Sequence, residues 1–407
     1  MLKGTNSEFG KVFNLRIVLE TIRLHGPVSR AETARITSLT RTTVSSIVLQ
    51  LIERGLVIET GRSSGKRGMP STLLELNPEG AFAVGLDMDR DHLTAVLMDF
   101  AGSVRQRIHH DLDFPTPDEG LDLLVDVTRS LIAQEAIVDD QILGVGVGFP
   151  GPLSSHAHDA ASPVVVPLFF PGWQDVPIVR ILTERLALPV LLENNASAAA
   201  VGEYWYGDHA FRHFYYVYLG VGLGGGAILN GQPYEGFRGN AGELGYLAVQ
   251  LPERTTHLGE FFHLPTLYTK LREAGGRAAT PHDLEALYRQ RDEVLLAWLE
   301  NAALHLAPAL IAIEHLFDPE AIIAGGRLPE PLLQHLLSAL ASRLPTLRQE
   351  GKPYAAALLP ARAGDDAAAL GLATLPIYRS VAPNSVHQLE ARPHASRRSP
   401  VSWLAGR

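Results

Sequence analysis

The sequence predicts an α/β protein in which a small, mainly helical module precedes a larger body of alternating strands and helices. Three observations lead to this fold class. Apolar residues recur at helical spacing in the first 55 residues, and apolar strands ending in glycine or polar clusters recur between residues 81 and 326. The length of 407 residues suits two or three domains of roughly 100–200 residues each.

Composition narrows the possible functions. Cysteine is absent, which excludes disulfides, thiolate zinc sites and cysteine nucleophiles. The chain shows no run of 18 or more apolar residues and begins without the apolar stretch of a signal peptide. We therefore expect a cytoplasmic protein with no membrane partner.

The net charge of −9 hides an asymmetry. Residues 1–75 carry 11 Lys and Arg against 6 Asp and Glu, whereas the rest carries 24 against 38. A basic segment on an acidic body is typical of a local nucleic-acid contact. Charge alone leaves a merely solvated surface equally open.

Helical periodicity organises the basic segment. Residues 11–25 have one apolar face, and Gly26-Pro27 ends that helix. Ser29 can cap a short second helix, with Glu32 completing a capping box. Thr40 can cap a third, longer helix that ends at Gly55.

A short helix, a tight turn and a longer helix form the helix-turn-helix arrangement, whose second helix enters the major groove of DNA. Small polar side chains and one arginine gather at the start of the third helix, where they suit contacts to bases and phosphates. The candidate DNA-binding residues here are Ser29, Thr40, Arg41, Thr42, Thr43, Ser45 and Ser46. The alternative is a plain three-helix bundle with a polar outer face.

Two predicted strands, at 56–59 and 71–76, flank the basic, glycine-rich stretch GRSSGKRGMP. Such a hairpin fits a wing, in which Arg62, Lys66 and Arg67 would contact phosphates or a minor groove. A solvated loop is the alternative. With the helices, these strands predict a winged helix-turn-helix domain over residues 1–76.

The body carries polar or glycine-rich turns at several strand ends, which is typical of an α/β protein with its site at that edge. The stretches are ILGVGVGFPGPL at 142–153, ENNASAAAVGE at 193–203, YLGVGLGGGAILNG at 218–231, GFRGNAGELGY at 236–246 and IIAGG at 322–326. A turn such as GVGLGGG brings backbone N–H groups close to a ligand, often a phosphate.

Together with SRAETARITSLTRTTVSSIVLQLIERGLV, these stretches resemble the ROK family (repressor, open reading frame, kinase), in its winged-helix repressor branch. The resemblance covers about residues 10–378. It implies a two-lobed, actin-like ATPase or sugar-kinase fold. The implied ranges are a sensor domain at 81–378, with lobe 1 at about 81–198 plus a C-terminal helix at about 363–378, and lobe 2 at about 199–362. Independently of the resemblance, Asn77-Pro78-Glu79-Gly80 predicts a linker at 77–80. The basic stretch after Tyr378 has little periodicity, which predicts a disordered tail at 379–407.

The sequence departs from the family's kinases at two places. The kinases carry an acidic base where this chain has Asn195, and an amide cannot accept the proton of a sugar hydroxyl. Their D-x-G-G-T phosphate turn is replaced by Asp87 to Asp91, whose carboxylates Asp89 and Asp91 would repel ATP. We expect no catalytic residue and no cofactor.

The family's structural zinc site, which uses one His and three Cys as ligands, also has no counterpart in this sequence. The His position is Tyr246, and no cysteine is present. His257 and His263 lie nearby, and we interpret them as surface residues rather than ligands. The loop is then held by apolar packing, for which the candidates are Phe261, Phe262, Leu264 and Leu267.

The effector site that the resemblance implies combines amides and carboxylates, which suit sugar hydroxyls. Its residues are Asn194, Asn195, Glu243, Tyr246 and Glu260. Around 167–170 the chain has Leu and Phe where relatives often carry a sugar-contacting Asn, so the ligand stays open. A structural role for Glu243 is the alternative.

Three functions remain. The first is a sugar-responsive DNA-binding transcriptional regulator, a repressor by family default, that acts as a homodimer or homotetramer on a palindromic operator. The second is an ATP-dependent sugar kinase with an accessory DNA-binding domain. The third is a regulator that has lost ligand binding and responds to a protein partner.

Overall fold

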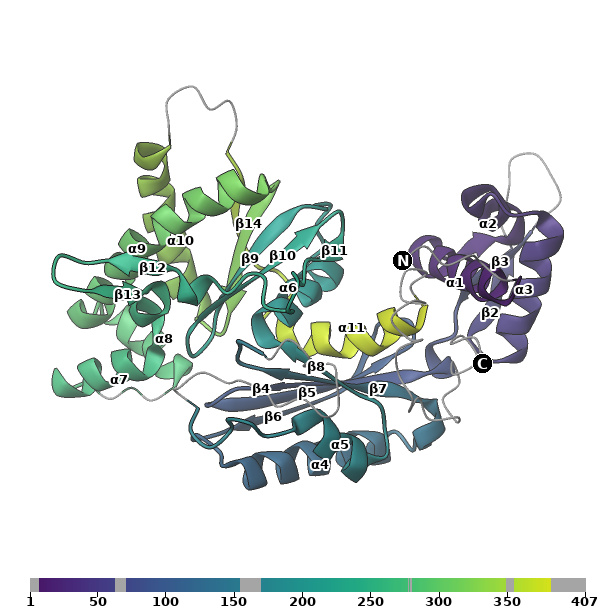
Figure 1. Cartoon of the computed structure of the whole chain (residues 1–407), viewed down its shortest axis with the longest axis horizontal. Coiled ribbons are helices and arrows are strands. Elements are labelled where there is room, and N and C mark those ends of the chain that lie inside the picture. Colours follow the sequence, from purple (N-terminus) through teal and green to yellow (C-terminus); the bar gives the residue numbers. More distant parts are fainter. Residues whose placement is uncertain are drawn as a thin grey trace.

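The computed structural model describes residues 7–62, 71–153, 170–276, 278, 280–348 and 355–381. In these ranges the chain forms a small N-terminal module and two larger lobes, each built around a five-stranded sheet (Figure 1). The predicted α/β class is confirmed. The wing residues Lys66 and Arg67 and the segment 154–169 lie outside the described residues, as does the chain after Val381.

The N-terminal module contains three helices and a three-stranded sheet of order β1-β3-β2, in the chain order expected for a winged helix-turn-helix. Its elements are α1 (Ser7–His25), β1 (Val28–Ser29), α2 (Arg30–Thr37), α3 (Arg41–Glu53), β2 (Val57–Arg62) and β3 (Thr72–Leu76). Apolar residues at helical spacing form its core, because each helix turns one face inward.

The two predicted helix caps form, with one correction. The Thr40 side chain accepts a hydrogen bond from the Thr43 N–H at 3.1 Å, and Ser29 accepts one from the Glu32 N–H at 3.2 Å. The capping box expected at Ser29 is incomplete, because the Glu32 carboxylate pairs with Arg35 one turn later. A guanidinium competes well for a carboxylate that would otherwise reach back to a backbone N–H.

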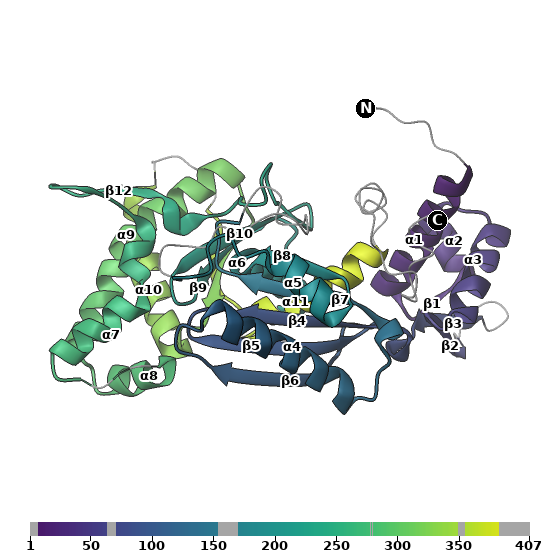
Figure 2. The ribbon, with the colours of Figure 1, turned by 60° about the horizontal axis from the view of Figure 1, so that its bottom comes forward.

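The first lobe contains a sheet of order β6-β5-β4-β7-β8. Its strands are β4 (Phe82–Met88), β5 (His92–Asp99), β6 (Val104–Asp111), β7 (Ile142–Phe149) and β8 (Val190–Asn194). Helices α4 (Pro117–Gln134) and α5 (Ile178–Leu186) cover one face, and α11 (Ala367–Val381) covers the other (Figures 1 and 2). Gly85 and Gly146 allow this close approach, since a Cβ there would meet α11 carbonyl oxygens at 2.1 and 2.0 Å.

The second lobe contains a sheet of order β11-β10-β9-β14-β15. Its strands are β9 (Phe214–Leu219), β10 (Leu223–Leu229), β11 (Gln232–Pro233), β14 (Ala321–Gly326) and β15 (Ala357–Pro360). Its helices are α7 (Leu264–Glu273), α8 (Pro281–Arg289), α9 (Glu293–Phe317) and α10 (Glu330–Leu347), and β12 (Ala248–Gln250) pairs with β13 (Thr255–His257) as a separate hairpin.

Helix α9 is long and apolar enough to cross a membrane by length and composition. Leu295, Leu299, Leu306 and Leu310 along it are nonetheless buried in the core of the second lobe. Helix α9 is therefore a core helix of the second lobe.

Helix α6 (Asn195–Tyr206) lies between the lobes and contacts β9 and β10 as well as α11. The boundary expected near residue 198 therefore falls inside a continuous helix. Helix α11 also extends to Val381, which is fully buried, so the chain is ordered past the expected tail start at 379. The remaining domain limits stay predictions.

The N-terminal module is docked firmly on the first lobe. One apolar core runs from Leu19 and Val48 of the module to Phe100 of the first lobe and to Ile377 and Val381 of α11. The expected linker at 77–80 is part of this junction, since the Asn77 side chain donates to the Gly55 carbonyl at 2.6 Å. Residues 77–80 are therefore packed into the junction between the module and the first lobe and do not form a free linker.

Candidate functional site

The exposed start of α3 forms the candidate DNA-binding surface. Arg41, Thr42 and Ser46 are exposed, and Ser45 is half-buried. Thr40 and Thr43 bond to each other through their hydroxyls at 2.8 Å, so they first stabilise the helix start. Ser29 likewise caps α2 and is half-buried.

Sequence reasoning missed two residues of this surface. Leu49, which is 54 % exposed, and Gln50 follow Thr42 and Ser46 at helical spacing and extend the same face by one turn. The helical period alone could have identified them. Of the predicted wing residues, Arg62 ends β2, whereas Lys66 and Arg67 lie outside the described residues.

The candidate effector site begins where β8 passes into α6. The Asn194 side chain accepts bonds from the Ala196 and Ser197 N–H groups at 2.7 and 3.3 Å, which fixes the helix start. Its amide nitrogen donates to Glu243 Oε1 at 3.1 Å. Gly151 leaves room for this pair, since a Cβ there would lie 2.2 Å from both. A hydrogen bond thus joins the two lobes at the site.

Two buried acceptors lie beside this hydrogen bond. The Asn195 amide donates to the Met88 carbonyl at 3.1 Å, but its Oδ1 has no hydrogen-bond partner among the described residues. Asp87 Oδ1 also has none there. Both atoms lie close to the position that a Cβ on Gly148 would take, at 3.0 and 3.5 Å. Adjacent unsatisfied acceptors are suited to ligand hydroxyl donors.

Burial changes the ionisation of two glutamates here. It raises the pKa of Glu193 to about 7, although the Asn194 N–H donates to its carboxylate and opposes the shift. Burial likewise raises the pKa of Glu243 to about 7 against the opposing bond from Asn194. Both side chains therefore titrate near neutral pH rather than carrying full charge.

Two other predicted effector residues are placed differently. Tyr246 is 48 % exposed and lies edge-on to His257. Glu260 is exposed, and its carboxylate accepts hydrogen bonds from Arg254 and the Thr256 hydroxyl, which lower its pKa to about 2. Of the predicted effector residues, Asn194 and Glu243 are therefore hydrogen-bonded to each other, whereas Glu260 is hydrogen-bonded to Arg254 and Thr256.

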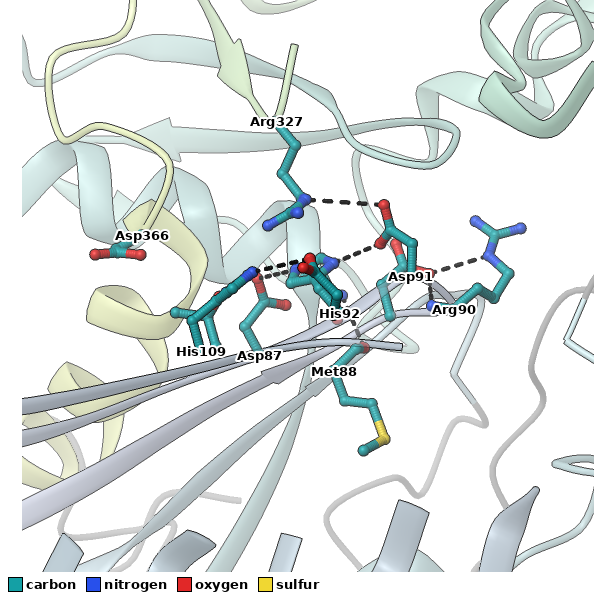
Figure 3. A network of polar contacts seen from close by, with 12 residues as sticks. Asp87, Met88, Arg90, Asp91, His92, His109, Arg327 and Asp366 are labelled. Atoms are coloured by element: carbon teal, nitrogen blue, oxygen red, sulfur yellow. Dashed lines mark hydrogen bonds and ion pairs between the residues drawn. The ribbon is translucent and has the colours of Figure 1, made fainter. Parts of the chain in front are cut away.

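The turn between β4 and β5 carries a network of charged residues (Figure 3). His92 contacts Asp91 at 2.6 Å and Asp87 at 3.3 Å, and Asp91 lies 3.9 Å from Arg327 of the second lobe. Burial lowers the pKa of His92, but the bonds to both carboxylates outweigh it and raise the pKa to about 9. His92 is therefore cationic at neutral pH.

This network corrects the expectation that free carboxylates face a phosphate site. Asp89 is paired with Arg90 at 3.0 Å, Asp87 and Asp91 both contact His92, and Asp91 also lies 3.9 Å from Arg327. Three cations therefore offset three carboxylates, and simple repulsion of ATP is weaker than the sequence implied. His92 and Arg327 were missed, although each directly follows a singled-out motif.

The loop that resembles the family's zinc segment is held by packing, as expected. Phe262, Leu264 and Leu267 are buried in the second-lobe core, and the Phe261 ring stacks on His305 at 3.6 Å. His257 is exposed, but His263 is half-buried, which corrects the interpretation of both as surface residues. The residues present do not fit a zinc ion, since no cluster of three or more His, Asp or Glu that could hold a metal occurs in the described part of the chain.

Comparisons with known proteins agree with this architecture. The sequence profile described as the ROK family matches residues 83–378. The xylose repressor of Bacillus spizizenii is 27 % identical over 380 residues, which cover 91 % of this chain and 96 % of that protein. The dual regulator NagC of Escherichia coli is 24 % identical over 383 residues, covering 85 % and 90 %.

Solved structures show the same fold. A ROK family transcriptional regulator, a homologue of the E. coli MLC protein, aligns with a TM-score of 0.72 and 20 % identity over 91 % of this chain and 97 % of that one. The ROK hexokinase from Thermus thermophilus aligns with a TM-score of 0.56 and 27 % identity, over 74 % of this chain and 99 % of the hexokinase. About a quarter of this chain therefore has no counterpart in the kinase.

Proposed function

Since the chain belongs to the ROK family, we propose that it is a cytoplasmic, sugar-responsive transcriptional repressor that binds DNA and has lost kinase activity. One observation carries the proposal. A module with winged-helix topology shares a continuous core with a body whose base position is occupied by Asn195. Relatives over most of the chain are named repressors of xylose and N-acetylglucosamine.

Helix α6 offers a physical route from the effector to DNA. Its first residue, Asn195, lies at the candidate effector site, and Trp205 near its end lies 4.0 Å from the guanidinium of Arg23 in α1. Arg23 is fixed by two bonds to Glu20, at 2.6 and 2.7 Å. A ligand that changes the lobe angle would tilt α6 and so reorient the winged helix.

The second lobe reaches the same junction. Tyr378 of α11 donates to Gln232 of β11, and its ring lies 6.4 Å from that of Trp205. In a homodimer this junction would change the spacing of two α3 helices, which read half-sites about one helical turn of DNA apart. Effector binding would then release a palindromic operator.

A gel shift tests the DNA-binding half of the proposal. The full chain is mixed with the DNA upstream of its own gene at several salt concentrations, because phosphate contacts make binding salt-dependent. Arg41→Ala is expected to weaken binding about tenfold or more, in line with the loss of one good base or phosphate contact. Arg185→Ala, a surface control paired with Asp122 outside the module, should bind as the parent does. Unchanged binding by Arg41→Ala would contradict the assigned surface.

A kinase with an accessory DNA-binding domain is the second candidate, favoured by the likeness to the Thermus hexokinase. It is tested by coupled ADP release with a sugar panel. We expect no steady turnover, since losing a general base typically costs about 10²–10⁴ in rate. Turnover typical of a kinase would overturn the proposal.

A further inference from the structure

Helix α3 carries a row of exposed side chains on the side opposite its buried face. The buried face consists of Val44, Ile47, Val48 and Leu51. The opposite side carries Thr42, Ser46, Leu49 and Glu53, which follow one another at helical spacing and are all exposed. We call these four exposed residues the outward stripe.

The outward stripe is better suited to the edges of bases than to phosphates. No lysine or arginine lies between Thr42 and Glu53 in the sequence, and a phosphate would repel the Glu53 carboxylate. Thr42 and Ser46 are small, so they let the helix backbone come close to the floor of a groove. Their hydroxyls can donate and accept hydrogen bonds there.

Leu49 differs from the rest of the outward stripe because its side chain has no polar atom. Within α3, all of whose residues are described, it is the only large apolar side chain that is exposed, at 54 %. A single exposed leucine is common on protein surfaces. Here Ser46 and Glu53 lie one helical turn before and after it, so a helix bound in the major groove would press Leu49 against base edges.

The major groove offers a leucine one apolar partner. Guanine, cytosine and adenine present hydrogen-bonding groups there, whereas thymine also presents a methyl group. Apolar contact with that methyl group removes apolar surface from water, which is favourable. A leucine that covered a base donor or acceptor would instead leave it without a partner, which is costly. Leu49 therefore favours an A·T pair over a G·C pair.

We propose that Leu49 packs against the methyl group of a thymine in the operator and so determines specificity at one base pair of each half-site. The inference rests on the proposed DNA-binding function and deepens it. The contact needs the methyl group itself and not the hydrogen-bonding edge of thymine. It can therefore be separated from every polar contact of α3.

The test removes that methyl group without changing the base sequence. The full chain selects its preferred duplex from a randomised library, and this duplex is prepared with thymine or with uracil, which pairs in the same way but lacks the methyl group. Gel-shift titration should show roughly tenfold weaker binding to the uracil duplex, since one buried methyl group contributes about fourfold and a dimer contacts two half-sites. Single uracils then locate the contact. Equal binding of the two duplexes, or selection of no preferred sequence, overturns the inference.

Leu49→Ala separates the leucine from any other effect of uracil. The position is exposed and alanine favours a helix at least as well as leucine, so the variant should fold. Low salt keeps its binding measurable through phosphate contacts, and under these conditions it should distinguish the two duplexes by about twofold or less. Leu49→Met, which stays apolar, should keep most of the preference for thymine.

Leu24→Ala is the matched control, because Leu24 of α1 is also 54 % exposed. This variant should bind both duplexes as the parent does. If Leu49→Ala weakens on uracil substitution as much as the parent and the Leu24→Ala control, another residue reads the methyl group and the inference is wrong.

Failure of this inference and failure of the proposed function look different. A chain that binds a preferred duplex and releases it in the presence of a sugar, but binds thymine and uracil duplexes equally, would refute only the role of Leu49. A chain that does not bind duplex DNA would refute the regulator itself.

Discussion

Glu193 and His92 are buried ionisable side chains whose surroundings shift their pKa values in the folded chain. Burial raises the pKa of Glu193 to about 7, so the folded state favours its neutral form. Burial opposes the charge of His92, but two carboxylates prevail and raise its pKa to about 9. The Glu193 carboxyl therefore favours its neutral form and the His92 imidazole its charged form. Replacing each side chain by an amide should then change the stability of the folded chain in opposite directions.

Glu193→Gln should stabilise the chain at alkaline pH. The folded carboxyl keeps its proton up to a pKa of about 7, against an ordinary value of 4.5, so the parent loses stability as pH rises through this window. The variant should exceed the parent by about 2–3 kcal/mol at pH 8 and not at pH 4.5. Urea unfolding at both pH values measures this. Glu184→Gln, at an exposed site on α5, is the control.

His92→Gln should destabilise the chain most at low pH. The raised pKa of about 9 gives stability that is complete below 6.5 and lost as pH rises through 9. We expect a loss of about 2–3 kcal/mol at pH 6 and much less at pH 9.5. Denaturant unfolding at the two pH values is compared with His257→Gln, an exposed histidine. Equal losses at both would mean that His92 acts by shape and not by charge.

At the scale of elements, the crossing of α6 and α11 depends on two glycines. A Cβ on Gly202 would lie 1.9 Å from the Ala367 carbonyl oxygen, and one on Gly371 would lie 1.8 Å from that of Ala198. The two backbones therefore touch directly. This contact fixes the helix that leads from the effector site to the N-terminal module.

Gly371→Ala tests this crossing, because the change in stability that we expect is opposite to the one that helix propensity predicts. Alanine normally favours a helix over glycine by about 1 kcal/mol. Here the methyl group would force the helices apart, and overpacking should cost about 1–3 kcal/mol net. Gly10→Ala in α1, where nothing lies within 4 Å of the added Cβ, should be neutral or stabilising. Thermal unfolding of both variants decides, and a stabilised Gly371→Ala would contradict the close crossing.

At the scale of the whole molecule, one core unites the N-terminal module with the first lobe. Phe100, Ile377 and Val381 are buried in the same cluster as the helices of the module. Motion of the lobe should therefore move the module as a rigid body. Such coupling needs no contact between effector and DNA.

Deleting residues 1–76 should therefore destabilise the rest of the chain. The deletion exposes large apolar side chains, each worth about 1.5–3 kcal/mol when buried. We expect the melting temperature of the body to fall by roughly 5–10 °C. The full chain should unfold in one calorimetric transition. A separate transition for the module, or an unchanged melting temperature after deletion, would show that the two parts are independent.

Local patterns in the sequence determined the elements and much of the site's composition. Helical spacing and side-chain caps predicted α1 to α3, because these signals act within a few residues. The resemblance to the ROK family indicated Asn194, Asn195 and Glu243 as effector residues. The same reasoning failed for Glu32, whose carboxylate had two local partners to choose from.

Tertiary structure alone decided which charges and surfaces meet. Asp91 pairs with Arg327, Asn194 with Glu243, and Arg23 with Trp205, and each pair joins segments far apart in the chain. Sequence spacing cannot predict such pairs, because the geometry of the packed sheets and helices sets the distances. For the same reason the sequence predicted free carboxylates in the β4–β5 turn, whereas in the folded protein they are paired with Arg90 and His92.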